Sequence, residues 1–465
     1  MKPDTIDRLE LHQKLAQGAI VVTGNSRLAA ALQQEFQQQA IDSGQNVWET
    51  PVIQSWNIWL KQLWEEAVFD GRIESPALLL TEVQEQYVWE SVIESLTAAI
   101  LRKEATANKA AEAWRQLINW QVSLDDIDFD LNEDTQAFRL WADEFERQCD
   151  EQGWLSAARM AEQLVERFND EEYKTDSQIL LLGFDELTPL QEALYSAIAN
   201  SGGSILWAEL AQAGQQGQSA VRLACTDNND EICTLAGWIQ QRLERQPGAR
   251  IGVVVPDLGA HRSSLIRRLT ELLVPGNLIN EGDESLPWNI SLGLPLKSYP
   301  VIETAFSILE LAGGSFQLDK LGPLLNSPYL AGASEEVGPR AVLDRKLRDI
   351  GEQNVSLKSL CWQAGSTVTP WHSPQLATHI CQLTDLAKSI PGSASTADWV
   401  KWFTEILNAA GWAKDRDFNA AEYQAIEAFH KLLARFSGLQ AVSGRLSYSR
   451  ALGQLRRLAL SQIFQ

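Results

Sequence analysis

A short segment near the N-terminus, Ala19-Ile20-Val21-Val22-Thr23, is apolar without alternation and is followed at once by a turn. Such uniformly apolar runs are typical of strands that are buried on both faces of a parallel sheet. Gly24-Asn25-Ser26 supplies the turn, and Ser26 is placed to cap a helix over residues 27–40. This strand–turn–helix unit predicts the α/β class. It also marks where such a protein would hold an anion, at the helix N-terminus.

Further strand–helix units follow the first one. Apolar runs at 179–182 and 204–207 predict strands, and a β-type signal at 50–53 precedes a helix that Ser55 caps. Thr188 and Pro189 open another helix, because proline suits a first helical turn. Residues 76–168 are helical in pattern throughout. One sheet is therefore expected from two parts of the chain, separated by a helical insertion.

The second half of the chain repeats this pattern. Apolar runs at 220–224 and 251–255, each followed by a helix, predict a second parallel-sheet domain after a linker at 210–219. Helices dominate again from about residue 299. We therefore expect a first α/β domain in two parts, with an insertion, and then a second α/β domain with its own insertion: 1–72, 73–174, 175–212, 213–300 and 301–465.

The first turn lacks what a phosphate-binding loop requires. The pattern G-x-x-x-x-G-K-[ST] uses glycines to aim backbone amides at phosphates, a lysine to reach them and a hydroxyl for Mg²⁺. Here Gly24 is the one glycine, the loop is short, and Arg27 stands in place of lysine. Arginine does not replace lysine inside such a cradle. A structural turn, or a residual contact to DNA or phosphate, fits better than nucleotide hydrolysis.

The expected Mg²⁺ carboxylates are also displaced. In an active motor the second strand ends directly in Asp-Glu, but here Gly183-Phe184 come first and Asp185-Glu186 follow two residues later. Two strand steps of about 3.3 Å each separate these carboxylates from their required place. The competing interpretation is that Asp185 and Glu186 are an acidic start to the next helix. No catalytic residue and no metal-ligand spacing is predicted in this chain.

Charge and cysteine content limit the possible partners and compartment. The net charge of −22 disfavours a non-specific DNA binder, which usually carries a basic surface. Basic clusters at Arg262, Arg267 and Arg268, and at 445–457, are either solvated helix faces or a phosphate-contacting strip. The five cysteines are widely spaced and odd in number, which argues against disulfides and zinc and favours a reducing, cytoplasmic location.

Two further patterns concern membranes and aromatic residues. There is no signal region or long apolar window, so no membrane association is expected. The seventeen tryptophans are unusual. Many lie in helical stretches, where core packing is the more frequent role and base stacking the alternative: Trp56, Trp59, Trp64, Trp89, Trp114, Trp120 and Trp141.

The order of elements resembles a superfamily 1 helicase, with a P-loop-NTPase-like architecture of two parallel-sheet domains that each carry a large helical insertion. More narrowly, the chain resembles the bacterial "probable DNA repair protein" family, which is similar to AddB and, more distantly, RecC. The resemblance spans the whole chain and rests on five strings: VTGNSRLA at 22–29, LGFDELTPLQ at 182–191, ARIGVVVPDL at 249–258, ISLGLPL at 290–296 and LNSPYL at 325–330.

The resemblance also implies what this chain lacks. Family members are longer and end in a RecB-like PD-(D/E)XK exonuclease domain, so residues 301–465 are expected to be an incomplete insertion. Mg²⁺ would belong to that absent nuclease domain, and no cofactor is expected here. Gln191 lies near the glutamine of the second helicase motif, whereas Pro256-Asp257 occupy the place of a phosphate-sensing arginine. With the two losses above, this predicts a helicase fold without its motor.

The resulting expectation is a DNA-binding scaffold for recombinational repair of double-strand breaks. It would hold single-stranded DNA or duplex ends, with a helicase or nuclease subunit as a possible partner. A divergent ATPase and a protein-interaction scaffold that never touches DNA are the alternatives. The degenerate nucleotide site would comprise Gly24, Asn25, Ser26, Arg27, Asp185, Glu186 and Gln191. The candidate DNA contacts are Asn25, Ser26, Arg27, Gln54, Ser55 and Trp56.

Overall fold

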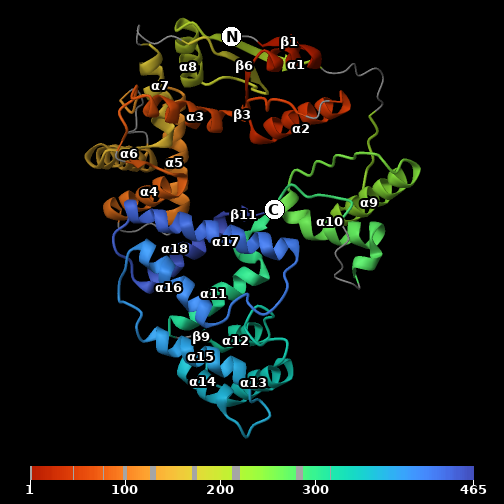
Figure 1. The fold of residues 1–465 in the computed structure, drawn as a ribbon, viewed down its shortest axis with the longest axis vertical. Coiled ribbons are helices and arrows are strands. Elements are labelled where there is room, and N and C mark those ends of the chain that lie inside the picture. The colour runs from red at the N-terminus through yellow and green to blue at the C-terminus, as the bar shows by residue number, and fades with distance from the viewer. Residues whose placement is uncertain are drawn as a thin grey trace. The chain divides into compact units, whose positions relative to one another are not determined.

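The computed structural model describes residues 3–44, 47–76, 78–97, 102–125, 132–169, 175–211, 220–278, 286–314 and 316–464. The chain divides into two compact units, Met1–Gln218 and Ser219–Gln465, here called unit 1 and unit 2 (Figure 1). The predicted boundaries near 174 and 212, and most of the predicted linker at 210–219, lie outside the described residues. The predicted α/β class is confirmed, because a parallel sheet and many helices are present.

Unit 1 contains a five-stranded parallel sheet with the strand order β1-β7-β6-β2-β3. The strands are β1 (Asp4–Ile6), β2 (Ile20–Thr23), β3 (Ile53–Ser55), β6 (Gln178–Leu182) and β7 (Ser204–Leu210). The apolar runs at 19–23 and 179–182 therefore form neighbouring central strands. From β2 the chain continues to β3 on one side of the sheet. From β6 it continues to β7 on the opposite side. The chain order consequently reverses between β2 and β6.

Helices cover both faces of this sheet. On one face, α1 (Arg8–Ala16) and α2 (Ser26–Asp42) pack on alternate residues of the strands, including Val21, Leu180 and Leu182. Because successive strand residues point to opposite faces, Val22 and Leu181 face the other side. There α3 (Trp56–Phe69) and α8 (Pro189–Asn200) cover the sheet, and both contact α7 (Met160–Phe168). Burial on both faces explains why these strands are uniformly apolar.

The helical part of unit 1 lies between β3 and β6 in the chain. It consists mainly of α4 (Glu82–Leu96), α5 (Lys103–Asn119) and α6 (Glu133–Gln152), with a short parallel pair formed by β4 (Leu78–Leu79) and β5 (Trp154–Leu155). The prediction that its tryptophans pack cores is confirmed for Trp59, Trp64, Trp89, Trp114 and Trp141, which are buried. Trp120, in contrast, is 48% exposed.

Unit 2 is built mainly of helices: α9 (Asn228–Arg245), α10 (Leu258–Leu273), α11 (Pro300–Ala312), α12 (Leu318–Leu325), α13 (Val337–Ile350), α14 (Leu357–Gly365), α15 (Pro374–Ala387), α16 (Thr396–Ala409), α17 (Ala420–Gly438) and α18 (Tyr448–Ser461). The strands of its described part form two short antiparallel pairs. Strand β8 (Leu294–Pro295) pairs with β11 (Ile463–Phe464), and β9 (Phe316–Gln317) pairs with β10 (Asn354–Val355).

The strands predicted at 220–224 and 251–255 are not formed, so the described part of unit 2 has no second parallel sheet. A parallel sheet requires helices on both of its faces. Here α9 and α10 pack mainly on each other, through Ala236 and Leu265 among others. The outward side chains of Val221 and Val254 remain 87% and 94% exposed. The apolar runs are present, but no described element covers their outer side.

Helix starts follow local side-chain chemistry. Thr188 caps α8 in a reciprocal box with Gln191, and Pro189 occupies the first turn, as predicted. Helix α3 begins after Ser55, also as predicted, although the Ser55 side chain makes no capping hydrogen bond. For α2 the prediction was wrong by one residue. Asn25 is the N-cap and accepts a hydrogen bond from the Leu28 amide at 2.9 Å, while Ser26 is the first helical residue.

Candidate functional site

Two loops and one direct strand–helix junction meet at the carboxyl edge of the unit 1 sheet. They follow β2, β3 and β6, whose last residues are aligned in register: Thr23 opposite Ser55 on one side, and Thr23 opposite Leu182 on the other. Because the three strands are parallel and adjacent, their carboxyl ends lie at one edge. This edge includes the reversal point between β2 and β6, where open α/β sheets usually bind their ligands.

The loops after β2 and β6 touch each other through glycine backbones. The Gly24 amide donates to the Leu182 carbonyl at 3.2 Å. A Cβ atom on Gly24 would lie 2.3 Å from the Gly183 carbonyl oxygen, closer than real Cβ contacts allow. Gly183 has a φ of +69°, and a Cβ there would lie 2.4 Å from Cδ2 of Leu28. The space between the two loops is therefore filled by backbone and by the Leu28 side chain.

This packing bears on phosphate binding. A phosphate loop needs several free backbone amides that point toward one anion. Here the Gly24 amide is bonded to the neighbouring strand, and the Leu28 amide is bonded to the Asn25 side chain. Asp185 and Glu186 are exposed in the loop after β6, at the same edge. The Gln191 side-chain oxygen accepts from the Thr188 amide at 3.0 Å, so this side chain belongs to a helix cap.

The end of β3 is joined to the loop after β2 by Thr23, the last residue of β2. The Thr23 hydroxyl is directed to the Asn25 carbonyl at 2.8 Å and lies 3.3 Å from the Gln54 carbonyl. Gln54 is half-buried and donates from Nε2 to Gln62 Oε1 at 2.8 Å. Ser55 is buried, so a ligand at the surface would not reach its hydroxyl.

Trp56 presents an aromatic surface beside this edge. Its ring is half-buried and packs against Trp59, with centroids 5.5 Å apart, and against Tyr195, also at 5.5 Å. Tyr195 is buried, its hydroxyl has no partner among the described residues, and burial raises its pKa well above the usual value. The indole of Trp56 thus packs against two buried aromatic side chains.

The structure brings the predicted residues of three separate sequence regions to one edge. Gly24, Asn25, Ser26 and Arg27 are exposed there, and no described residue bonds to the Arg27 guanidinium. Sequence reasoning did not select Thr23, Gly183 or Tyr195. For Gly183 a signal existed, because a glycine directly after a buried strand often marks a close backbone approach. Thr23 and Tyr195 gave no such signal.

The basic clusters of unit 2 are largely engaged by the protein itself. Arg262 donates to the Leu292 carbonyl at 3.1 Å, and Arg268 forms an ion pair with Glu271 at 2.7 Å. Arg456 pairs with Glu310, and Arg445 bonds to the Ser393 carbonyl. These arginines fit the interpretation of helix faces tied to their surroundings better than that of a free phosphate-contacting strip.

Within the described ranges, no cluster of three or more His, Cys, Asp or Glu side chains could hold a metal ion. None of the described helices has both the length and the apolar character needed to cross a bilayer. No protein-family model matches this chain, and no curated protein matches it either.

Replacing Gly24 with alanine is expected to lower the free energy of unfolding by about 1–3 kcal/mol, because the new methyl group would collide with the Gly183 backbone. Urea denaturation followed by circular dichroism measures this loss. Ser26→Ala, an exposed change two residues away, is the control and should alter stability by less than about 0.5 kcal/mol. Equal stability of Gly24→Ala and the wild type would contradict the close contact between the two loops.

Proposed function

We propose that unit 1 binds single-stranded DNA along the carboxyl edge of its sheet. The observation that carries this proposal is the gathering of Asn25, Arg27, Gln54 and Trp56 at one edge by register. Arg27 offers a phosphate a cation that no described residue pairs, and the exposed Asn25 offers a polar side chain, whereas Gln54 is engaged by Gln62. Trp56 offers a supported ring on which a base can stack. Stacking and phosphate contacts together bind single strands without reading sequence.

The charge of the chain sets an expected range for this affinity. Asp185 and Glu186 lie at the same edge as Arg27, and the whole chain carries a net charge of −22. Both features oppose a polyanion, so binding is expected to be weak and to require low salt. An interaction of this strength suits a part that guides a strand within a larger enzyme.

For the whole protein, we propose a role as the helicase-like part of a bacterial DNA-repair nuclease that retains the motor fold without its motor. Support comes from the parallel sheet, the absent lysine and the engaged amides at Gly24 and Leu28. In this proposal a P-loop-type sheet serves as a scaffold for DNA, and cleavage belongs to a Mg²⁺-dependent nuclease domain or subunit. Titration with Mg²⁺–ATP by calorimetry should give no binding heat.

Replacing Trp56 or Arg27 with alanine tests the DNA proposal. Loss of one stacked base costs about 1–3 kcal/mol, so Trp56→Ala should raise the Kd for oligo-dT roughly 5-fold to 150-fold. Arg27→Ala should weaken binding less and lower the salt slope, d log K/d log [salt], by about 0.7. Fluorescence anisotropy with a labelled oligonucleotide at low salt measures both.

Matched controls come from the same unit. Trp120→Ala removes another half-exposed indole, and Arg102→Ala removes another exposed cation. Neither residue lies on the loops after β2 and β6 or at the start of α3. Trp56→Phe should recover part of the affinity, since a ring remains. The proposal fails if the full chain does not bind at tens of micromolar. It also fails if the Trp56 and Arg27 variants bind like their controls.

A protein-interaction scaffold is the second candidate function, and one observation favours it. Val221, Leu223, Val253 and Val254 of unit 2 are exposed apolar side chains on extended segments. Such surfaces often mark protein contacts. This candidate predicts that the chain has no DNA affinity and co-purifies with a nuclease or helicase subunit, and that Val254→Asp disrupts this complex.

A further inference from the structure

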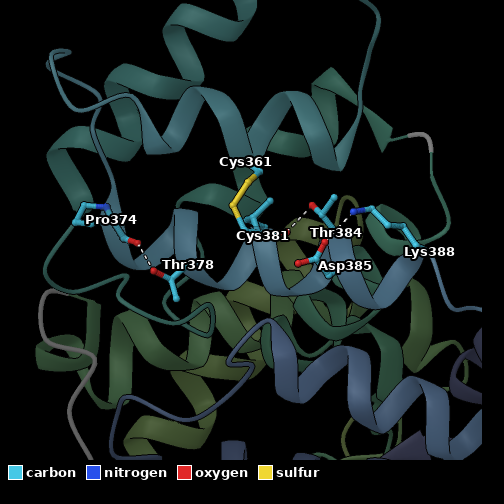
Figure 2. Close-up of a disulfide and its surroundings, with 8 residues drawn as sticks. Cys361, Pro374, Thr378, Cys381, Thr384, Asp385 and Lys388 are labelled. Carbon is cyan, nitrogen blue, oxygen red and sulfur yellow. Dashed lines mark hydrogen bonds and ion pairs between the residues drawn. A yellow bond between two sulfur atoms is a disulfide. The ribbon is translucent and has the colours of Figure 1, made fainter.

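Two of the five cysteines are joined in unit 2. Cys361 of α14 is bonded to Cys381 of α15, and the two Cα atoms are 5.3 Å apart, well inside the range that a disulfide needs (Figure 2). The expectation that the cysteines do not pair is wrong for these two. Their separation of 20 residues was no guide, because the chain folds back on itself between α14 and α15.

The helix pair is assembled by contacts that do not depend on the bond. Leu360 and Ala364 of α14 are fully buried, as are Ile380 and Leu383 of α15. The Ser373 amide also donates to the Ala364 carbonyl at 2.9 Å, which fixes where α15 begins. Apolar burial and this hydrogen bond therefore hold α14 and α15 together in addition to the disulfide.

The two sulfur-bearing residues are also accessible. Cys361 and Cys381 are both half-buried, so part of each residue is open to solvent. Cys149 of unit 1 differs, because burial raises its thiol pKa to about 12 and leaves it inert. Cys225 and Cys233 are half-buried but unpaired. Among the cysteines, this pair alone combines access with a partner.

We propose that Cys361 and Cys381 form a reversible redox latch that fastens α14 to α15 in response to a small-molecule disulfide such as oxidised glutathione. One cysteine thiolate attacks a sulfur of glutathione disulfide, forms a mixed disulfide and releases one reduced glutathione. The second thiolate then attacks the protein-bound sulfur and releases the second glutathione. The two protons of the cysteine thiols end on the two released glutathione thiols, so the protein pair is oxidised, glutathione disulfide is reduced, and no proton is lost overall. Excess reduced glutathione drives the same steps backward.

The latch acts on a helix whose start is held by non-covalent contacts. At the N-terminus of α15, the Gln375 and Leu376 amides donate to the Glu336 carboxylate, and the bond at Cys381 fixes the helix two turns further on. In the reduced protein, α15 is held by the hydrogen bonds to Glu336 and by apolar packing. Oxidation should therefore slow local opening of α14 and α15 more than opening elsewhere in unit 2.

The test treats the purified full chain with oxidised or reduced glutathione. Oxidation should remove two hydrogen atoms from the protein mass and give a peptide that links Cys361 to Cys381, and millimolar reduced glutathione should reverse both changes. The oxidised form should melt about 5–10 °C higher, as expected for closing a loop of this length in a unit of this size. Amide exchange over 357–365 and 374–387 should slow in the same form.

Two variants and a control test whether the redox-dependent difference in Tm comes from this cysteine pair. Cys361→Ser and Cys381→Ser should each abolish the redox-dependent difference in Tm, whereas Cys225→Ser should keep it. The mass and exchange measurements use the wild type, so they decide the question even where a variant does not fold. The proposal is overturned if the linked peptide never appears, if reduced glutathione does not reopen it, or if both redox forms melt and exchange alike. None of these readouts involves DNA.

Discussion

Glu336→Ala is expected to lower the free energy of unfolding by about 3–5 kcal/mol, because it leaves a buried arginine without its counter-charge. Glu336 and Arg340 lie one turn apart at the start of α13 and are 5% and 1% exposed. Arg340 donates to the Glu336 carboxylate from Nη2 at 2.9 Å and from Nε at 3.1 Å. Burial lowers the pKa of Arg340, which reflects the cost of holding its charge away from water.

The same carboxylate has a second function in packing. Its two oxygens accept the Gln375 amide at 2.6 Å and the Leu376 amide at 3.1 Å, where α15 begins. The N-cap residue of that helix, Ser373, makes no side-chain capping bond, so Glu336 supplies the cap from a distant part of the chain. A carboxylate at this place also interacts favourably with the helix dipole. Truncation removes the ion pair and the cap together.

Chemical denaturation followed by circular dichroism measures this effect. Adding Arg340→Met to Glu336→Ala should recover a large share of the loss, since the unpaired charge is removed as well. Glu352→Ala is the surface control, because Glu352 is exposed and has no partner among the described residues, and it should change stability by less than about 0.5 kcal/mol. A loss below about 1 kcal/mol for Glu336→Ala, or no recovery in the double variant, would contradict this account.

Trp89→Ala should lower the free energy of unfolding by a similar amount, about 3–5 kcal/mol. The reason is different, because this change leaves a cavity at the centre of the helical part of unit 1. Trp89 of α4 is fully buried and stacks on Phe145 of α6, with centroids 4.3 Å apart and planes at 10°. Trp114 of α5 completes the cluster, 6.0 Å from Phe145 in an edge-on arrangement. One side chain from each of three helices thus meets at this point.

A conservative variant separates lost volume from lost chemistry. The Trp89 indole N–H is buried and has no partner among the described residues, so Trp89→Phe removes an unsatisfied donor and keeps a stacked ring. Trp89→Phe should lower the free energy of unfolding by well under half as much as Trp89→Ala. Trp120→Ala, at the exposed end of α5, should be close to neutral. Guanidinium denaturation with near-ultraviolet circular dichroism measures all three. A near-neutral Trp89→Ala would disprove the cluster's central position.

Local chemistry along the chain determined much of the fold. The uniformly apolar run at 19–23, the turn at Gly24 and the Thr188-Pro189 helix start all depend on near neighbours in sequence. Hydrogen-bond caps, proline geometry and hydrophobic period act over a few residues. Such features can therefore be predicted without knowing what packs against them. The positions of Arg27 and Trp56 in the first turns of the helices that follow β2 and β3 could be predicted in the same way.

Tertiary structure alone decided how distant segments meet. The order β1-β7-β6-β2-β3 places Gly183 against Gly24, although more than 150 residues lie between them in the chain. Likewise, the pairing of Cys361 with Cys381 and the Glu336 cap on α15 depend on how helices pack. The strands predicted at 220–224 and 251–255 are not formed for the same reason. A strand needs neighbouring strands and covering helices that its own sequence does not supply.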